Sequence, residues 1–144
     1  MENKKLFDFQ EQWEKLVNKT NENLNSLSKE ERVWFTVQVL IDVVDNGGMI
    51  SFFYNYGADY YKETIEDLRI LNQKKIIKLL EKIGKVCFKN NIPKDIEKRN
   101  EIINSFPDDG KLNKKLERID NEFYKLENKL EEDLVNYICI NKLV

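Results

Sequence analysis

Histidine is absent from the 144-residue chain, and glycine, proline and cysteine are scarce, at five, two and two residues. Without histidine, the chain can form neither a Ser-His-Asp nor a Cys-His nucleophile system, and no metal site with imidazole ligands. It also lacks the GxGxxG and GxxxxGK[ST] loops that hold phosphates. We therefore expect no catalytic residues, no cofactor and no metal centre.

Long hydrophobic runs are also missing. The longest apolar-rich segment, VWFTVQVLIDVV, is interrupted by polar residues and is too short to cross a membrane. The N-terminal segment has no apolar stretch of the kind that signal peptides carry. Cys87 and Cys139 lie far apart and form no CxxC pair. These features predict a cytoplasmic protein, without membrane contact, that has two reduced and mostly buried thiols.

The charges nearly cancel, since 24 basic residues oppose 26 acidic ones for a net charge of −2. A DNA-binding domain is usually clearly basic, so we expect no direct contact with nucleic acid. The distribution is uneven, however: residues 33–67 carry six acidic side chains against Lys62, and residues 68–88 carry six basic ones against Glu81. The acidic set is the candidate surface for a basic protein partner. Its members are Asp42, Asp45, Asp59, Glu63, Glu66 and Asp67.

A plainer interpretation of the same pattern is that both charge sets are solvated outer faces that pair with each other. The sequence leaves these two interpretations open.

Apolar residues recur at helical spacing through most of the chain, and no period-2 segment is convincing. A capping box of Ser28 and Glu31 opens a helix over about 29–45 that is apolar nearly all round, as a central helix is. Its Val and Ile content also suits a strand, but its length and cap favour a helix. From Leu112 the apolar residues follow a heptad, which predicts a long helix over about 111–140. The heptad stripe also permits a homodimer seam.

The remaining segments complete the prediction. An amphipathic helix includes Leu6 to Val17, a short buried helix follows at Met49, and another begins at Ala58 or Asp59. Two more are expected, one that includes Ile76 to Cys87 and one over about 93–105 with Pro93 in its first turn. The whole chain, residues 1–144, is therefore expected to be all-α: a single compact helical domain of six or seven helices with a long C-terminal helix.

The segment DNGGMISFFYNYG, residues 45–57, is unlike ordinary helix sequence. Asn and Gly tolerate the left-handed conformation that ends a helix, and adjacent aromatic residues usually belong to a core. Asn55 is expected to bond to nearby backbone. We interpret the segment as a structural corner formed by Asn46, Gly47, Gly48, Phe52, Phe53 and Asn55. Two other interpretations are a ligand site on exposed backbone N–H groups and a tyrosine-rich protein interface.

Residues 42–71, DVVDNGGMISFFYNYGADYYKETIEDLRIL, resemble the bacterial DNA-mimic protein family in their N-G-G-x-x-x-F-F-x-N run. Residues 116–141, LERIDNEFYKLENKLEEDLVNYICIN, resemble the closing helix of that family. The resemblance implies an all-α domain. It also implies a dimer whose regularly spaced carboxylates imitate phosphates and occupy the DNA-binding face of a transcriptional repressor. This sequence departs from that pattern, because residues 111–133 hold six basic side chains against seven acidic ones.

The sequence thus predicts a bacterial, non-enzymatic, protein-binding domain. Its expected partner is a basic DNA-binding regulator. An immunity-type inhibitor of a toxin is one alternative. A small-ligand binder or enzyme that uses the Asn46–Asn55 corner is another.

Overall fold

The computed structural model describes residues 4–21, 23–108 and 110–144. Of the described residues, 81% are helical, and they form seven α-helices and no strand. The helices are α1 (Gln10–Thr20), α2 (Lys29–Gly47), α3 (Met49–Tyr54), α4 (Tyr61–Ile70), α5 (Lys74–Phe88), α6 (Ile96–Asn104) and α7 (Gly110–Ile140). Three short 3-10 turns, η1 (Leu6–Phe9), η2 (Leu24–Ser26) and η3 (Tyr56–Tyr60), join or precede them. The prediction of a compact all-α fold with a long C-terminal helix is confirmed.

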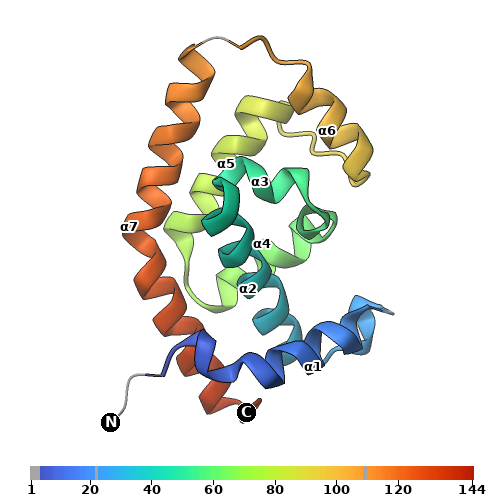
Figure 1. The fold of residues 1–144 in the computed structure, drawn as a ribbon, viewed down its shortest axis with the longest axis vertical. Coiled ribbons are helices and arrows are strands. Elements are labelled where there is room, and N and C mark those ends of the chain that lie inside the picture. The colour runs from blue at the N-terminus through green and yellow to red at the C-terminus, as the bar shows by residue number, and fades with distance from the viewer. Residues whose placement is uncertain (1–3, 22, 109) are drawn as a thin grey trace.

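Helix α2 lies at the centre of the molecule and the other elements pack around it (Figure 1). The Ser28–Glu31 capping box starts it, with Ser28 Oγ accepting from the Glu31 backbone nitrogen at 3.1 Å. Val33, Val37, Leu40 and Val44 are fully buried. A helix that is apolar on most faces can be stable only in such a position, because each face needs a neighbour that excludes water.

Helix α7 runs along one side of the molecule and packs on α2, α3 and α5 (Figure 1). Its heptad stripe points into the core: Ile119, Phe123, Leu130, Leu134 and Ile138 are buried. Burial within its own chain accounts for the regular stripe. The homodimer permitted by the same spacing stays a prediction.

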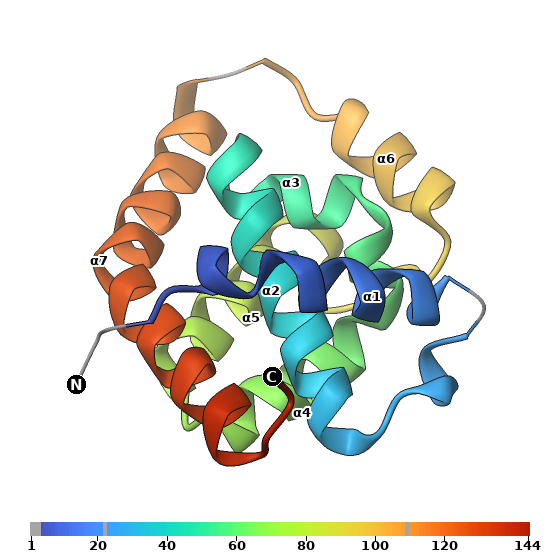
Figure 2. The same ribbon diagram turned by 60° about the horizontal axis from the view of Figure 1, so that its bottom comes forward.

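The N-terminal end of the fold is closed by α1, which crosses in front of α2 in Figure 2. Trp13 packs against Trp34 and Phe35, with ring centroids 6.1 and 5.9 Å apart. Trp34 is buried, and its indole N–H donates to Gln38 Oε1 at 2.7 Å. The pair of tryptophans thus joins the first helix to the central one, and the buried indole donor of Trp34 is satisfied.

The junction between α2 and α3 differs in detail from the prediction. Gly47 still belongs to α2, and of the two glycines only Gly48 has a positive φ, at +81° with an extended ψ of 178°. Asn46 is exposed, whereas Phe52 and Phe53 are fully buried and Asn55 donates to the Ser51 carbonyl at 2.6 Å. The corner is therefore a single-residue turn at Gly48 followed by a buried aromatic pair.

Helix α6 starts at Ile96, with Asp95 as its N-cap, rather than at Pro93. The carbonyls of Pro93 and Lys94 instead accept hydrogen bonds from the Arg99 guanidinium at 3.0 and 2.7 Å. The cysteines differ from the prediction as well: Cys87 is buried, but Cys139 is exposed near the end of α7.

Candidate functional site

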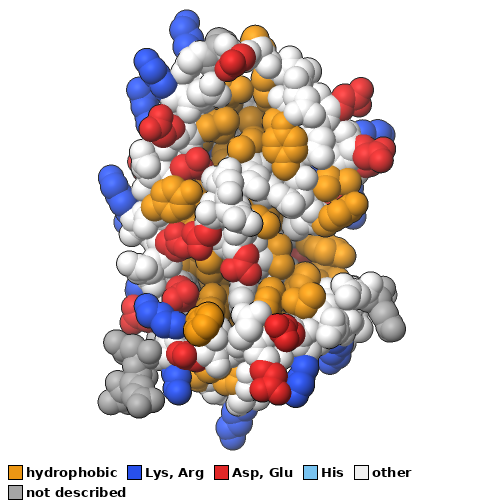
Figure 3. Space-filling view, viewed as in Figure 1, with side chains coloured by type: hydrophobic (Ala, Val, Ile, Leu, Met, Phe, Trp, Pro, Cys, Tyr) orange, Lys and Arg blue, Asp and Glu red, His pale blue; other side chains and the backbone are white. Residues whose placement is uncertain are grey.

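Five carboxylates gather where α7 meets the central helix. Asp42 and Asp45 come from α2, and Asp120, Glu127 and Glu131 come from α7; we call this set the acidic seam. Figure 3 shows acidic side chains along this junction, with basic side chains on the outer edge of α7. Within the described residues only Glu131 of this set makes an ion pair, with Lys5 at 3.7 Å. The seam therefore carries negative charge that the chain itself barely neutralises.

The carboxylates lie close enough to perturb one another. Partial burial, a hydrogen bond with Asp45 and the charges of Asp45 and Glu131 raise the pKa of Glu127 to about 8. Burial and the charge of Asp45 raise the pKa of Asp42, despite a hydrogen bond with Gln38. Like charges this close favour sharing a proton, so at neutral pH the Glu127 carboxyl holds a proton facing Asp45.

Tyr124 lies among these carboxylates. Its side chain is 44% exposed, and its hydroxyl donates to the Val44 carbonyl at 3.3 Å, which holds the ring across the junction of α2 and α7. Burial and the charges of Asp120, Asp45 and Glu127 raise the pKa of the phenol. An exposed aromatic ring surrounded by polar groups is typical of protein interfaces, where tyrosine is enriched.

The structure divides the six acidic residues of the predicted partner surface into two groups. Asp42 and Asp45 belong to the acidic seam, whereas Asp59, Glu63, Glu66 and Asp67 lie on η3 and α4. Asp67 is 0% exposed and accepts from Arg32 at 2.7 Å and from Thr36 at 2.7 Å. Glu66 also bonds to Arg32, at 3.2 Å. These two side chains therefore fasten α4 to the N-terminal half of α2.

Asp59 is one of the acceptors of a fully buried cation. Arg99 is 0% exposed, and its five N–H donors reach Asp59 and the carbonyls of Phe53, Asn55, Pro93 and Lys94 at 2.7 to 3.0 Å. Every donor of the guanidinium is thus satisfied, which is the condition for burying it. This arginine fixes the loop after α3 and the loop before α6 to each other.

Sequence reasoning missed five of these residues: Arg99, Asp120, Tyr124, Glu127 and Glu131. The last four follow helical spacing, at i, i+4, i+7 and i+11, so they share one face of the long helix, and this periodicity could have found them. No pattern marks Arg99 among the 24 basic residues of the chain.

In the described part of the chain, no three His, Cys, Asp or Glu side chains are grouped so as to hold a metal ion. None of the described helices combines the length and the apolar character needed to span a membrane.

Comparison with known proteins places the chain in a family. Neither the curated proteins nor the solved structures contain a match. The sequence model of the DMP19-like protein family, in contrast, matches residues 25–141. This range contains α2, α7, the Gly48 turn and the whole acidic seam. The chain belongs to the DMP19-like protein family.

Proposed function

We propose that the chain is a non-enzymatic protein-binding domain whose acidic seam takes the place of DNA on the DNA-binding face of a basic regulator. The DMP19-like family is a family of DNA mimics, and the seam supplies the negative charge that such mimicry needs. Of the six acidic residues predicted from sequence, Asp42 and Asp45 carry this role, and Asp120, Glu127 and Glu131 join them.

The density of carboxylates is the observation that carries the proposal. Asp120 and Glu131 are eleven residues apart on α7, or roughly 16 Å. Asp42 and Asp45 lie beside this stretch, since the charge of Glu131 raises the pKa of Asp42 and Asp45 raises that of Glu127. The seam therefore holds five carboxyl groups along roughly 16 Å of α7, and because Glu127 keeps its proton at neutral pH it has one charge per ~4 Å, against one phosphate per ~3.4 Å along a DNA strand. A lysine- or arginine-lined groove that fits a phosphate row would meet similar spacing here.

The proton held by Glu127 gives the surface a pH dependence. A cationic partner favours the ionised carboxylate, so its binding expels the proton that the raised pKa retains. By linkage, binding should tighten as the pH rises from about 6 towards the pKa of about 8 and then level off. Tyr124, in the middle of the seam, would supply apolar contact with the same partner.

The test starts from capture of partners from the source organism's lysate at low and moderate salt, with identification by mass spectrometry. The variant Asp42→Lys/Asp45→Lys changes the seam, and Glu97→Lys/Glu101→Lys on α6 is the matched control with the same change in net charge. We expect a salt-sensitive DNA-binding protein that the seam variant no longer retains and the control still does. Glu63→Lys examines the separate acidic group on α4.

Competition then examines mimicry itself. The captured regulator should release its own DNA site when the chain is added, and the seam variant should fail to displace it. A partner that binds wild type and seam variant equally, or that holds DNA and this chain at once, would rule out the proposal. A toxin as the captured partner would support the immunity-type alternative instead.

A further inference from the structure

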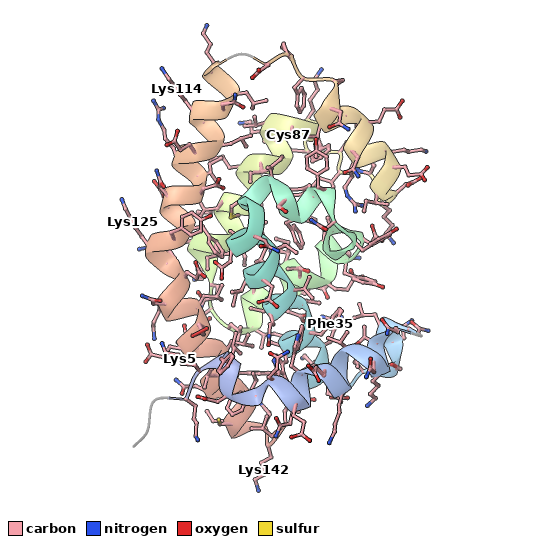
Figure 4. The ribbon with its side chains drawn as sticks, in the orientation of Figure 1. Lys5, Phe35, Cys87, Lys114, Lys125 and Lys142 are labelled. Carbon is pink, nitrogen blue, oxygen red and sulfur yellow. The ribbon has the colours of Figure 1, made fainter. Side chains whose placement is uncertain are left out.

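A second charged surface lies on the opposite side of α7 from the acidic seam. Two surface grooves, of about 650 and 480 Å³, follow one another between α5 and α7. Basic side chains line both, and we call this set the basic face: Lys75, Lys78, Lys82, Lys111, Lys114, Lys115, Arg118 and Lys125. Lys114 and Lys125 point outward from α7, away from the core (Figure 4). Glu122 is the acidic residue among the lining side chains.

Most of the basic face has no anionic partner in its own chain. Lys75, Lys78, Lys82, Lys114, Lys115, Arg118 and Lys125 are exposed, and within the described residues none of them makes an ion pair. Cations spaced one helical turn apart repel each other unless anions gather there. The expected mutual pairing of acidic and basic segments is thus largely missing on this side of the molecule.

The net charge of −2 conceals this arrangement because it averages over two faces. A helix with its side chains is ~10–12 Å across, so α7 keeps the two faces about that far apart. The Debye length is ~8 Å at physiological ionic strength. A polyanion on the basic face is therefore largely screened from the carboxylates of the seam.

The composition of the basic face indicates which polyanion fits it. Among the described residues, the exposed large hydrophobic side chains are Phe7, Tyr56, Ile70, Tyr124, Ile140 and Val144, and none lines the two grooves. The apolar side chains that do line the grooves are buried or half-buried, and none is aromatic: Leu79, Val86, Leu112 and Leu126. Protein interfaces are usually anchored by buried aromatic or apolar groups, and single-stranded nucleic acids stack their bases on aromatic rings. The phosphodiester backbone of a duplex needs only cations.

We propose that the basic face binds double-stranded DNA through its phosphates, without reading the sequence. Lys111 and Lys125 are fourteen residues apart, or roughly 21 Å, which corresponds to about six base pairs. The inference does not rest on the acidic seam or its partner. It replaces the expectation, drawn from net charge, that nucleic acid makes no direct contact.

The experiment is fluorescence anisotropy with a labelled duplex of about 20 base pairs, titrated from about 50 to 200 mM salt. Lys78→Glu/Lys125→Glu reverses two charges in one groove. Lys94→Glu/Lys98→Glu makes the same change in net charge at exposed positions beside and on α6. We expect binding that the groove variant weakens by roughly tenfold or more. Its slope of log K against log[salt] should be shallower by roughly 2, while the control stays close to wild type.

Three results would overturn the proposal: no duplex binding at the lowest salt, equal weakening in both variants, or tighter binding of polyglutamate than of duplex. The last would mark the face as a site for an acidic protein. Unchanged thermal melts of both variants would show that the fold is intact. Asp42→Lys/Asp45→Lys should bind duplex at least as well as wild type. Loss of duplex binding and loss of regulator binding are therefore measured on different variants, and either proposal can be wrong while the other holds. The regulator competition is accordingly repeated with the Lys78→Glu/Lys125→Glu variant.

Discussion

Asp120 accepts a hydrogen bond from the backbone nitrogen of Met49 at 2.8 Å. The contact joins the centre of α7 to the first residue of α3, 71 positions earlier in the chain. The two segments that resemble the DNA-mimic family, around Gly48 and around Asp120, are therefore in direct contact. At this contact the Asp120 carboxylate from one segment lies against the Gly48 turn of the other.

Gly48→Ala should destabilise the fold by about 1–3 kcal/mol. A Cβ at Gly48 would lie 2.5 Å from Asp120 Oδ2, and its φ of +81° is unfavourable for any L side chain. Gly47→Ala is the neighbouring control. Its Cβ would meet only the Ser51 side chain, at 3.0 Å, and alanine is favoured over glycine inside a helix by about 0.5–1 kcal/mol. Equal losses in chemical denaturation would mean that the special position is not Gly48.

Arg99→Met should cost about 3–5 kcal/mol, because it leaves Asp59 and four backbone carbonyls without their donor. Arg69→Met, at an exposed position on α4, controls for the loss of a guanidinium. Urea denaturation of both variants measures the difference. If Arg99→Met unfolds at the same urea concentration as the control, the buried arginine does not hold the two loops together.

Glu127 should make the stability fall as the pH rises. Its pKa is about 8 in the folded chain against 4.5 as its ordinary value, so the folded state binds the proton more tightly. That contribution to stability is complete below about pH 4.5 and is lost as the pH rises through about 8.

Glu127→Gln removes the destabilisation that an ionised Glu127 causes at high pH. The melting temperature of the variant should therefore exceed that of wild type at pH 9, and the difference should shrink towards pH 5. Glu132→Gln, exposed on the same helix, controls for the loss of one negative charge. A melting difference that Glu127→Gln and Glu132→Gln share at every pH would contradict the close approach of Glu127 to Asp45.

The cysteines should react at different rates with a thiol reagent. Cys139 is exposed, whereas burial both shields the Cys87 thiol and raises its pKa, so the reactive thiolate is scarce there. One thiol should be titrated rapidly in the native protein and the second only on unfolding. Cys139→Ser should abolish the rapid phase, and persistence of that phase would place Cys87 at the surface.

The fold could be predicted because each strong signal is local. The Ser28–Glu31 box and the heptad of α7 act within a few turns of the chain, and the structure preserves both. The start of α6 was placed too early, because Pro93 suits a first turn, whereas the structure caps the helix at Asp95 and uses the Pro93 and Lys94 carbonyls as acceptors for Arg99. No pattern near Pro93 records that contact.

The candidate site was harder to predict, because surface charge depends on which helix faces meet. Counting charges along the chain grouped Asp67 with Asp42, yet Asp67 is buried against Arg32 while Asp42 borders α7. The same count made residues 111–133 of α7 nearly neutral. Its acidic and basic residues in fact occupy different sides of one helix, which only the packing of α7 against α2 and α5 determines.

The division of charge across α7 has a consequence for how the molecule behaves on a chromatography column. A sphere of net charge −2 would be held weakly by an anion exchanger and not at all by a cation exchanger. This chain presents a carboxylate surface to the one resin and a lysine surface to the other. At neutral pH and low ionic strength it should be retained by both resins, and it should bind each resin through a different side of α7.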